Sequence, residues 1–383
     1  MKAASDTTHF IRAEPIESLP PPTLVPGPVA WVRENLFSGP VNTLLTILVV
    51  YLLYVSVPPI IEFFFIDAVW SGEDRDACRA ETAGREIGAC WAYVINKINY
   101  FVYGSYPVDE RWRVNLFFAL LAFGVVWLLW LRAPRRDLGA VYFFVVFPIA
   151  AYILLSGTSI LGFAEVPTSL WGGILVTIIV ATVGIVFSLP LGILLALGRR
   201  SKLPIVRLAS VIFIEFVRGV PLITVLIMAN TMLPLFLPAG ITVDRLARPL
   251  IGVAVFASAY MAEVVRGGLQ AIPKGQYEGA MSLGLNYPKM MFFIILPQAL
   301  RIVIPGIVNT FIGLFKDTSL VAIVGIFDII RTIEASRVDP NWAAPTVSYT
   351  GYAFAGLFYF IFCWGMSRYS VGVERRLAAG QQR

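Results

Sequence analysis

The chain alternates long apolar runs with short polar segments. Several of the runs hold no charged residue over roughly 18 positions or more, the length that a helix needs to cross a bilayer. This pattern predicts an all-α integral membrane protein with about eight transmembrane helices. The expected spans are residues 41–61, 114–131, 138–160, 170–197, 219–237, 249–272, 300–333 and 350–373. The seventh is too long for one straight crossing, and we expect it to bend or break near Lys316 and Asp317.

Two further segments are amphipathic or aromatic rather than uniformly apolar. In residues 204–218 the charged side chains of Arg207, Glu215 and Arg218 fall in one stripe at helical spacing, and the remainder is apolar. This predicts an interfacial helix that lies along the inner membrane surface and leads into the span 219–237. Residues 91–103 are rich in aromatics, which favours an element at the outer membrane surface.

The basic residues orient these spans. Four basic groups fall on one side of the membrane if both termini are cytoplasmic, as the positive-inside rule requires. The opposite side then holds the acid-rich loop 67–113. The four groups are Arg132, Arg135 and Arg136; Arg199, Arg200 and Lys202; Lys274 and Lys289; and Arg375 and Arg376.

Composition supports the membrane assignment and narrows the function. Of 383 residues 58% are hydrophobic and only 14% are charged, which excludes the water-soluble classes. The net charge of +6 is not gathered in a patch interleaved with aromatics, so we expect no nucleic-acid partner. Residues 1–40 lack the apolar core of a signal peptide and are rich in proline, which favours a cytoplasmic tail; a second short tail is expected at 374–383.

The cysteines and the single histidine suggest no metal centre. His9 stands alone in the tail, and no Cys/His cluster has the spacing of metal ligands. Cys78 and Cys90 lie in the outer loop, where a disulfide is chemically permitted. A bridge and two free thiols remain equal alternatives at this point.

The loop 273–297 predicts a short helix between two membrane spans. Pro273 and Gly275 end the preceding span, a helix follows from Gln276 to Leu283, and Gly284 ends it in the left-handed conformation. Asn286 is placed to cap the next helix, with Pro288 in its first turn. We expect Pro297 to break that helix and return the chain to the bilayer.

Small residues make this short helix suitable for close docking. Gly279, Ala280 and Ser282 allow a partner surface to approach the backbone, and Glu278 lies where a carboxylate favours the helix dipole or pairs with a partner arginine. The spacing of Glu278, Gly279, Ala280, Gly284 and Pro297 resembles the cytoplasmic docking loop of ATP-binding-cassette importer permeases. This resemblance implies the docking residues Gln276, Glu278, Gly279, Ala280, Ser282, Leu283, Gly284 and Pro297.

The sequence lacks the motifs of an enzyme. It contains no Gly-rich phosphate loop followed by Lys and Ser or Thr, no Ser/His/Asp or Cys/His set, and no HExxH. We therefore expect a transport subunit without its own ATPase site, and energy must come from a partner or from an ion gradient.

The docking loop and several further motifs resemble the permease subunits of polar amino acid ABC importers, the histidine, glutamine and general L-amino acid permease family. The similarity covers roughly residues 170–373 and is carried by FIEFVRGVPL at 213–222, AYMAEVVRGG at 259–268, IPKGQ at 272–276, LPQAL at 296–300 and KDTSL at 316–320. Gly279 departs from the family's usual alanine and weakens the helix slightly. The N-terminal extension is similar to that of the larger general L-amino acid permease.

The resemblance implies the architecture, the partners and the location. It implies a type I ABC importer permease core at 166–373, preceded by an extension of three transmembrane helices at 41–165. It also implies a bacterial inner-membrane complex with a second, related permease, two ATPase subunits that bind ATP and Mg²⁺, and an extracytoplasmic amino-acid-binding protein. This chain would then need no cofactor of its own and would carry L-amino acids by alternating access.

Charged and polar residues inside the predicted spans have two interpretations. They either line the substrate path or form ion pairs that hold span six against span seven, and the second interpretation is favoured. The candidates for the path are Glu263, Asn309, Lys316, Asp317, Thr318 and Ser319; the expected structural ion-pair residues are Glu215, Arg218 and Arg266. Arg266 is one turn beyond Glu263, so these two are expected to pair.

Two rival functions remain. The intramembrane charges permit an ion-gradient-driven secondary amino acid transporter, although a docking loop would then serve no purpose. A membrane-embedded enzyme or structural anchor would require intramembrane acids to act without a histidine.

Overall fold

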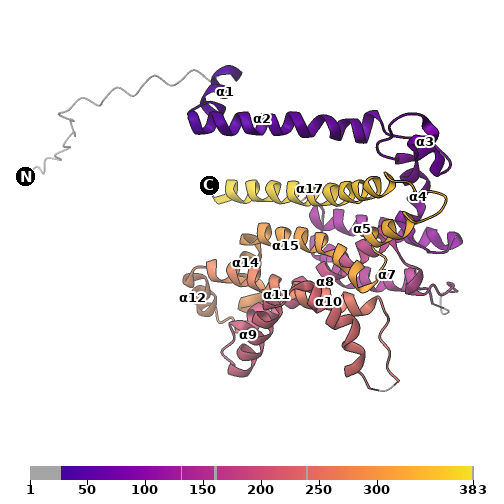
Figure 1. The fold of residues 1–383 in the computed structure, drawn as a ribbon. Coiled ribbons are helices and arrows are strands. Elements are labelled where there is room, and N and C mark those ends of the chain that lie inside the picture. Colours follow the sequence, from indigo (N-terminus) through magenta and orange to yellow (C-terminus); the bar gives the residue numbers. More distant parts are fainter. Residues whose placement is uncertain (1–26, 131, 159–161, 239, 382–383) are drawn as a thin grey trace, which may run out of the picture. The chain divides into compact units, whose positions relative to one another are not determined.

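The computed structural model describes residues 27–130, 132–158, 162–238 and 240–381, and within these ranges it contains helices and isolated β-bridges but no strand. The predicted Pro-rich tail falls mostly on residues outside the described part. The chain divides into two compact units, residues 1–66 and residues 67–383, which are described separately. The domain boundary expected near residue 165 was placed where the recognisable sequence motifs begin, and it stays a prediction. The division after Ile66 is based on contacts between residues. Figure 1 gives the element labels.

The described part of the first unit is one long apolar helix preceded by a short one. α1 (Pro28–Leu36) and α2 (Pro40–Ile61) each begin with proline, whose fixed φ suits a first turn. A π-helical turn, η1 (Glu62–Ile66), extends α2 to a stretch of 27 residues that coincides with the predicted span 41–61. No residue of these elements is buried, so the apolar side chains are exposed all round, as a lipid-facing helix requires.

The second unit is a helical bundle with short connections. Its elements are η2 (Arg75–Cys78), α3 (Ala80–Ala83), α4 (Trp91–Tyr103), η3 (Val108–Glu110), α5 (Arg111–Leu129), α6 (Arg136–Val141), η4 (Tyr142–Val146), α7 (Phe147–Ser156), η6 (Thr168–Leu170), α8 (Gly173–Arg199), α9 (Pro204–Gly219), α10 (Leu222–Thr231), η7 (Leu233–Phe236), α11 (Ala247–Ala271), α12 (Lys274–Ser282), α13 (Tyr287–Met290), η8 (Met291–Ile295), α14 (Leu296–Ile302), α15 (Ile304–Asp317), η9 (Thr318–Val324), α16 (Ile329–Ser336) and α17 (Val347–Gln381).

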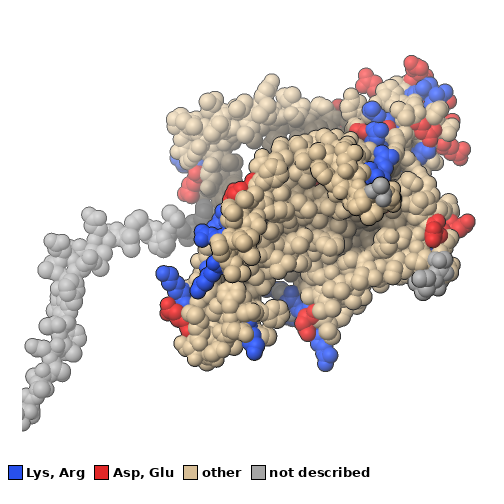
Figure 2. All heavy atoms as spheres, turned by 90° about the horizontal axis from the view of Figure 1, so that it is seen from below, with Lys and Arg blue, Asp and Glu red and all other residues tan. Residues whose placement is uncertain are grey.

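The membrane-length helices agree with the predicted number of spans. Seven helices of the described chain are long and apolar enough to cross a bilayer, or eight if the bent pair α9 and α10 forms one span. Figure 2 shows a broad surface free of charged side chains, with Lys, Arg, Asp and Glu towards the edges of the view, as lipid contact requires. The all-α membrane fold predicted from the sequence is confirmed.

The helix in the span expected at 219–237 is shorter than predicted. α10 ends at Thr231 and is followed by the short 3₁₀ element η7, and α9 and α10 meet at an angle of 105°. The bend lies at Val220, whose backbone is extended because the following Pro221 disfavours the helical conformation there. The predicted amphipathic helix at 204–218 is present as α9.

The predicted break in the segment 300–333 is confirmed. α15 ends at Asp317 and passes into the 3₁₀ helix η9, which terminates at Gly325 with a φ of 77°. A new helix, α16, then begins after Asp328, whose side chain accepts a hydrogen bond of 2.9 Å from the Arg331 N–H. The N-cap satisfies a backbone donor that would otherwise lack a partner at the helix start.

Helices α8 and α11 form the centre of the bundle. A Cβ at Gly192 of α8 would lie 2.7 Å from the Met261 side chain of α11, so glycine is needed for this close packing. Met261, Ala262 and Val265 of α11 are fully buried against α8 and its neighbours. Within a bilayer such helix pairs are stabilised mainly by van der Waals packing, which the small residues at this contact allow.

Residues 67–113 and 326–342 pack together and are here called the outer cap, after the side of the membrane on which the sequence predicts residues 67–113. Cys78 and Cys90 form a disulfide, and the Val69 N–H donates to the Ala89 carbonyl at 2.8 Å. Helix α4, whose expected place at the membrane surface stays a prediction, packs one face against the bundle, with Tyr93 and Phe101 fully buried among α8, α16 and α17. The aromatic residues of this segment therefore serve a packing role.

Two long-range contacts join the two segments of the outer cap, and a third attaches the cap to α17. The Lys97 ammonium lies 2.5 Å from the Asp339 carboxylate, and the Tyr93 hydroxyl is hydrogen-bonded to the Ser336 hydroxyl. The buried Cys90 N–H donates to the Thr350 hydroxyl of α17 at 2.8 Å. All three contacts join segments more than 240 positions apart in sequence; the first two close the cap, and the third holds it on α17.

Candidate functional site

The docking segment, residues 273–297, has nearly the local structure that its sequence predicts. Helix α12 covers Lys274–Ser282, so the expected limits of 276 and 283 are shifted towards the N-terminus. Gly284 has a φ of 73°, and the Asn286 side chain caps α13 by accepting from the Lys289 N–H at 3.2 Å. The short helix is thus ended by glycine and followed by a capped helix, as predicted.

The break expected at Pro297 is wrong. The chain stays helical from α13 through the π-helical turn η8 into α14, and Pro297 occupies the first turn of α14. The π-turn widens the helix just before the proline, which removes the clash that a regular α-helix would create. The helix ends later, at Val303, where the backbone φ of −100° leaves the helical region before α15 begins.

Helix α12 presents one side to the bundle and the other to solvent. Ala280 is only 2% exposed, whereas Leu283 is 76% exposed and Met281 57%. Glu278, Gly279 and Ser282 are also exposed, and a Cβ built at Gly279 would meet no atom within 4 Å. Among the described residues the Glu278 carboxylate has no ion-pair partner. The outer side therefore combines small residues, exposed apolar groups and a free acid, which suits a protein partner.

The inner side of α12 is braced by polar contacts that sequence analysis missed. Arg200, the residue after α8, donates to the Leu269 carbonyl at 2.7 Å and to the Tyr277 hydroxyl at 3.2 Å, and its guanidinium lies 5.7 Å from the Tyr277 ring centroid. Gln298 donates to the Gln276 side chain at 3.1 Å. Arg200 had counted only as a marker of orientation, because no sequence pattern links it to Tyr277.

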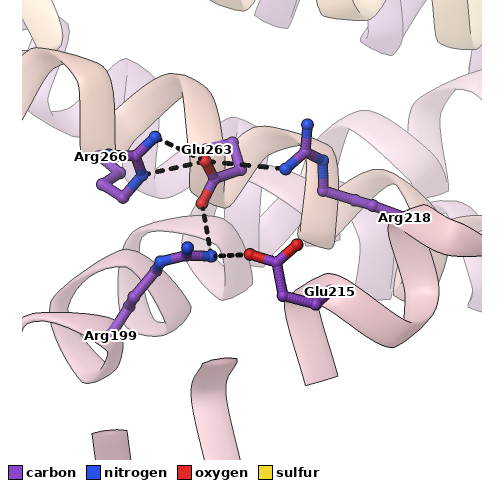
Figure 3. A network of polar contacts seen from close by, with 5 residues as sticks. All are labelled: Arg199, Glu215, Arg218, Glu263 and Arg266. Atoms are coloured by element: carbon purple, nitrogen blue, oxygen red, sulfur yellow. Dashed lines mark hydrogen bonds and ion pairs between the residues drawn. The ribbon is translucent and has the colours of Figure 1, made fainter. Parts of the chain in front are cut away.

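A network of ion pairs surrounds Glu263 of α11 (Figure 3). Its carboxylate lies 2.8 Å from Arg266 on the same helix, 3.0 Å from Arg199 of α8 and 3.7 Å from Arg218 of α9. Arg199 also donates a hydrogen bond of 2.7 Å to Glu215 of α9. The Glu263 side chain is 15% exposed, so the pairs are partly shielded from water.

The network corrects the expected partners of Glu263. The pairing with Arg266 is present, but the remaining pairs tie α11 to α8 and α9 and not to the seventh span. Arg199 was missed as a pairing residue, since its position after an apolar run suggested only a positive-inside marker. The geometry therefore favours a structural role for Glu263 at the junction of three helices.

The other candidates for the substrate path lie along α15 and at the start of η9. Thr318 is buried, donates to the Phe315 carbonyl at 2.8 Å and lies 3.2 Å from the Tyr359 hydroxyl; Ser319 donates to the Lys316 carbonyl at 2.9 Å. Lys316 and Asn309 are exposed seven positions apart, on one side of α15. The ion pairs of Glu263 do not include Lys316, so these candidates are not brought into one site with Glu263 in the described chain.

Asp328 is a buried acid outside the membrane-length helices. It is fully buried, and one of its carboxylate oxygens has no hydrogen-bond partner among the described residues. Burial raises the pKa of this carboxyl to about 7 because the charged form loses its hydration, although backbone hydrogen bonds from α16 oppose the shift. No group of three or more potential metal ligands accompanies it in the described part of the chain.

Known proteins resemble this chain over most of its length. Residues 188–378 match the family described as binding-protein-dependent transport system inner membrane component. The chain is 49% identical to the inner membrane amino-acid ABC transporter permease protein YhdY of Escherichia coli, over 92% of this chain and 94% of that protein. It is 39% identical to the glutamate/glutamine/aspartate/asparagine transport system permease protein BztC of Rhodobacter capsulatus, over 97% and 98% of the two chains.

A solved structure shows a more distant likeness. The crystal structure of an amino acid ABC transporter with histidines is 27% identical and has a TM-score of 0.46, over 53% of this chain and 92% of that chain.

Proposed function

The chain belongs to the family of binding-protein-dependent transport system inner membrane components, and from this membership we propose that it is the permease of an ATP-driven importer of L-amino acids. Relatives named as amino-acid permeases align with nearly the whole chain, which supports this substrate class. The membrane-length helices supply the path, and other subunits supply the energy.

The observation that carries the coupling proposal is the exposed outer side of α12. Glu278 has no ion-pair partner among the residues that the structure describes, and the position beside it at Gly279 is open, so this surface is available to a partner. α12 follows α11 after a turn of two residues, and Arg200 and Gln298 brace it against α8 and α14. A force on α12 would therefore reach the central helices without being absorbed by a loose loop.

The complete transporter contains further subunits in this proposal. Two ATPase subunits bind ATP and Mg²⁺, with one docked on α12 of this chain and the other on a second, related permease. An extracytoplasmic binding protein delivers the amino acid, and both termini of this chain are cytoplasmic. ATP binding closes the ATPase pair, and the docking helices transmit that motion to the membrane gate.

Within the bundle, the proposed substrate path follows the polar end of α15. The exposed Asn309 and Lys316 lie on one side of this helix, where an ammonium or carboxylate group can be met by hydrogen bonds or charge. Glu263 is assigned to structural stabilisation, because arginines already occupy its carboxylate.

Purification of the complex from its native membrane tests the function. We expect an ATPase and a second permease to be recovered with this chain. We also expect the complex to hydrolyse ATP faster when an L-amino acid and its binding protein are added. An ion-gradient-driven transporter would instead continue transport when the ATPase is inactivated by mutation, and would stop when an uncoupler collapses the gradient. That second pattern would overturn the proposal.

A further inference from the structure

A basic pocket opens beside the ion-pair network. It has a volume of about 530 Å³ and lies between the end of α8, α9 and the end of α11. No acidic side chain lines it. The lining residues are Arg199, Arg200, Arg207, Val211, Arg266 and Gln270.

The charges around this pocket are not balanced within the chain. Arg199 and Arg266 share the carboxylate of Glu263, and among the described residues Arg200 donates only to neutral oxygens. Arg207 is exposed, and its side chain has no ion pair or hydrogen bond to a described residue. The five arginines of the pocket and network face two glutamates, which leaves a net charge of +3 in one place. Such a site attracts an anion.

An apolar stripe runs along α9, the helix that also supplies Arg207 and Val211 to the pocket. The stripe consists of side chains at helical spacing that are between 58% and 81% exposed, and it is adjacent on the helix to the face that carries Arg207 and Val211. Its members are Ile205, Leu208, Ile212 and Phe216. A soluble anion would have no use for this stripe, whereas an amphiphile with an anionic head uses both surfaces.

We propose that the pocket binds the phosphodiester of an anionic phospholipid, with the acyl chains along the apolar stripe of α9. Planar guanidinium groups match phosphate oxygens in a bidentate geometry, and the cluster supplies more than one of them. An interfacial amphipathic helix places such a pocket at the depth of the lipid headgroups, and basic pockets between transmembrane helices are suited to anionic headgroups.

A lipid in this pocket would contact Arg200, the residue that braces the docking helix α12. Arg200 lines the pocket and at the same time holds Tyr277 of α12 and the Leu269 carbonyl at the end of α11. A bound phosphate would therefore fix the guanidinium that braces α12. The site is placed to make coupling depend on membrane composition, a consequence that rests on the proposed function, while lipid binding itself does not.

Retention of lipid by the purified full chain tests the binding site. The chain is equilibrated with mixed phosphatidylcholine and phosphatidylglycerol nanodiscs, and the lipid that stays bound is quantified by native mass spectrometry without ATP or amino acid. Arg207→Gln is the variant of choice because this side chain holds no other residue. We expect retained phosphatidylglycerol to fall about fivefold, the effect of one basic residue near a charged membrane surface.

The matched control is Lys202→Gln, which removes the same charge from an exposed position that does not line the pocket. Unchanged retention in this control supports a specific site. Equal losses in both variants, or no loss in Arg207→Gln, would overturn the proposal.

A separate arm identifies the source of the anion. If inorganic phosphate at millimolar concentration displaces phosphatidylglycerol, the pocket is a site for a soluble anion. That outcome would refute the lipid proposal. Loss of a co-purified ATPase from Arg207→Gln with unchanged lipid retention would assign it to a protein partner. Absence of transport activity affects neither readout, so failure of the proposed function remains distinguishable.

Discussion

The outer cap binds its polar groups internally, whereas the docking segment leaves several of them facing outward. In the cap, Cys78 is covalently joined to Cys90, Lys97 is paired with Asp339, and Tyr93 is fully buried. In the docking segment, Glu278 is unpaired among the described residues and Leu283 is largely exposed. Both regions connect membrane-length helices, so their difference does not follow from connectivity alone.

This difference separates two uses of a connecting segment. A segment that buries its aromatics and closes its ion pairs gains stability from its own bundle and has little left to offer a partner. A segment that exposes small and apolar residues on a braced helix gives up that gain and provides a surface for association. The docking segment is therefore expected to respond to mutation through partner binding, and the cap through stability.

The largest expected effect is loss of coupling in Glu278→Arg. The substitution reverses the charge at an exposed position of α12 and leaves the buried Ala280 and the brace at Tyr277 untouched. We expect the chain to fold and insert normally, but recovery of the ATPase in a pull-down to fall at least about tenfold, as like charges across an interface require.

The same reversal at Glu81 is the control for this experiment. Glu81 is exposed in α3 of the outer cap and has no place in the docking surface. Glu81→Arg is expected to recover the ATPase fully. Full recovery with Glu278→Arg as well would contradict the assignment of α12 as the docking helix.

The next effect tests the closure of the outer cap. Replacing both Cys78 and Cys90 by serine removes a cross-link that spans 12 positions, which lowers the free energy of unfolding of the cap by about 3 kcal/mol. Protease cleavage within residues 67–113 is the measurement, with ATPase recovery as the readout that stays constant. Non-reducing peptide mass mapping of the native protein checks the bridge, and alkylation of both thiols in native membranes would refute it.

A pH titration tests how the buried Asp328 affects the stability of the outer cap. Burial raises the pKa of its carboxyl from 3.8 to about 7, so the folded chain favours the protonated form. The resulting stability is fully present below pH 3.8 and is lost as the pH rises through about 7. Between pH 5 and pH 8 the wild-type chain should lose about 2–3 kcal/mol relative to Asp328→Asn, which keeps the acceptor for the Arg331 N–H.

The comparison for this titration is the unfolding midpoint of both proteins at the two pH values. Glu334 and Tyr359 are the other titratable groups that act on Asp328, and both are unchanged in the variant. A difference between wild type and Asp328→Asn that does not vary with pH would show that the carboxyl is already ionised at pH 5.

The sequence predicted the docking segment better than the cap, and the reason is physical. The helix start at Pro273, the left-handed Gly284 and the cap at Asn286 are set by neighbouring residues, so local rules suffice. The burial of α4 depends on α16 and α17, which lie far along the chain. An aromatic-rich helix looks the same in sequence whether its rings face lipid or a protein core.

Two errors show where local rules stop. Pro297 predicted a break, but the π-turn η8 accommodates it, and such a turn leaves no sequence signature. Arg199 was read as a marker of orientation, although it is bound to both Glu215 and Glu263. The pairing of Glu263 with Arg266 could be predicted from the sequence, because residues three apart on a helix share a face. The partners of Glu263 from α8 and α9 depend on tertiary packing and could not.

The smallest expected effect concerns Glu263. It tests whether this residue stabilises the fold, as the ion pair of the outer cap does, or takes part in transport. Glu263→Gln keeps the shape of the side chain but removes the charge shared by Arg199, Arg218 and Arg266. If the network is structural, the free energy of unfolding falls by about 1–2 kcal/mol, since charge-assisted bonds are replaced by neutral ones, and the KM for amino acid stays constant. Arg266→Gln alone and in combination completes a double-mutant cycle, and a coupling energy near zero would deny the pair any stabilising role. A large rise in KM with unchanged stability would place Glu263 on the substrate path. In that case α11 would contribute to the transport route and not only to the junction with α8 and α9.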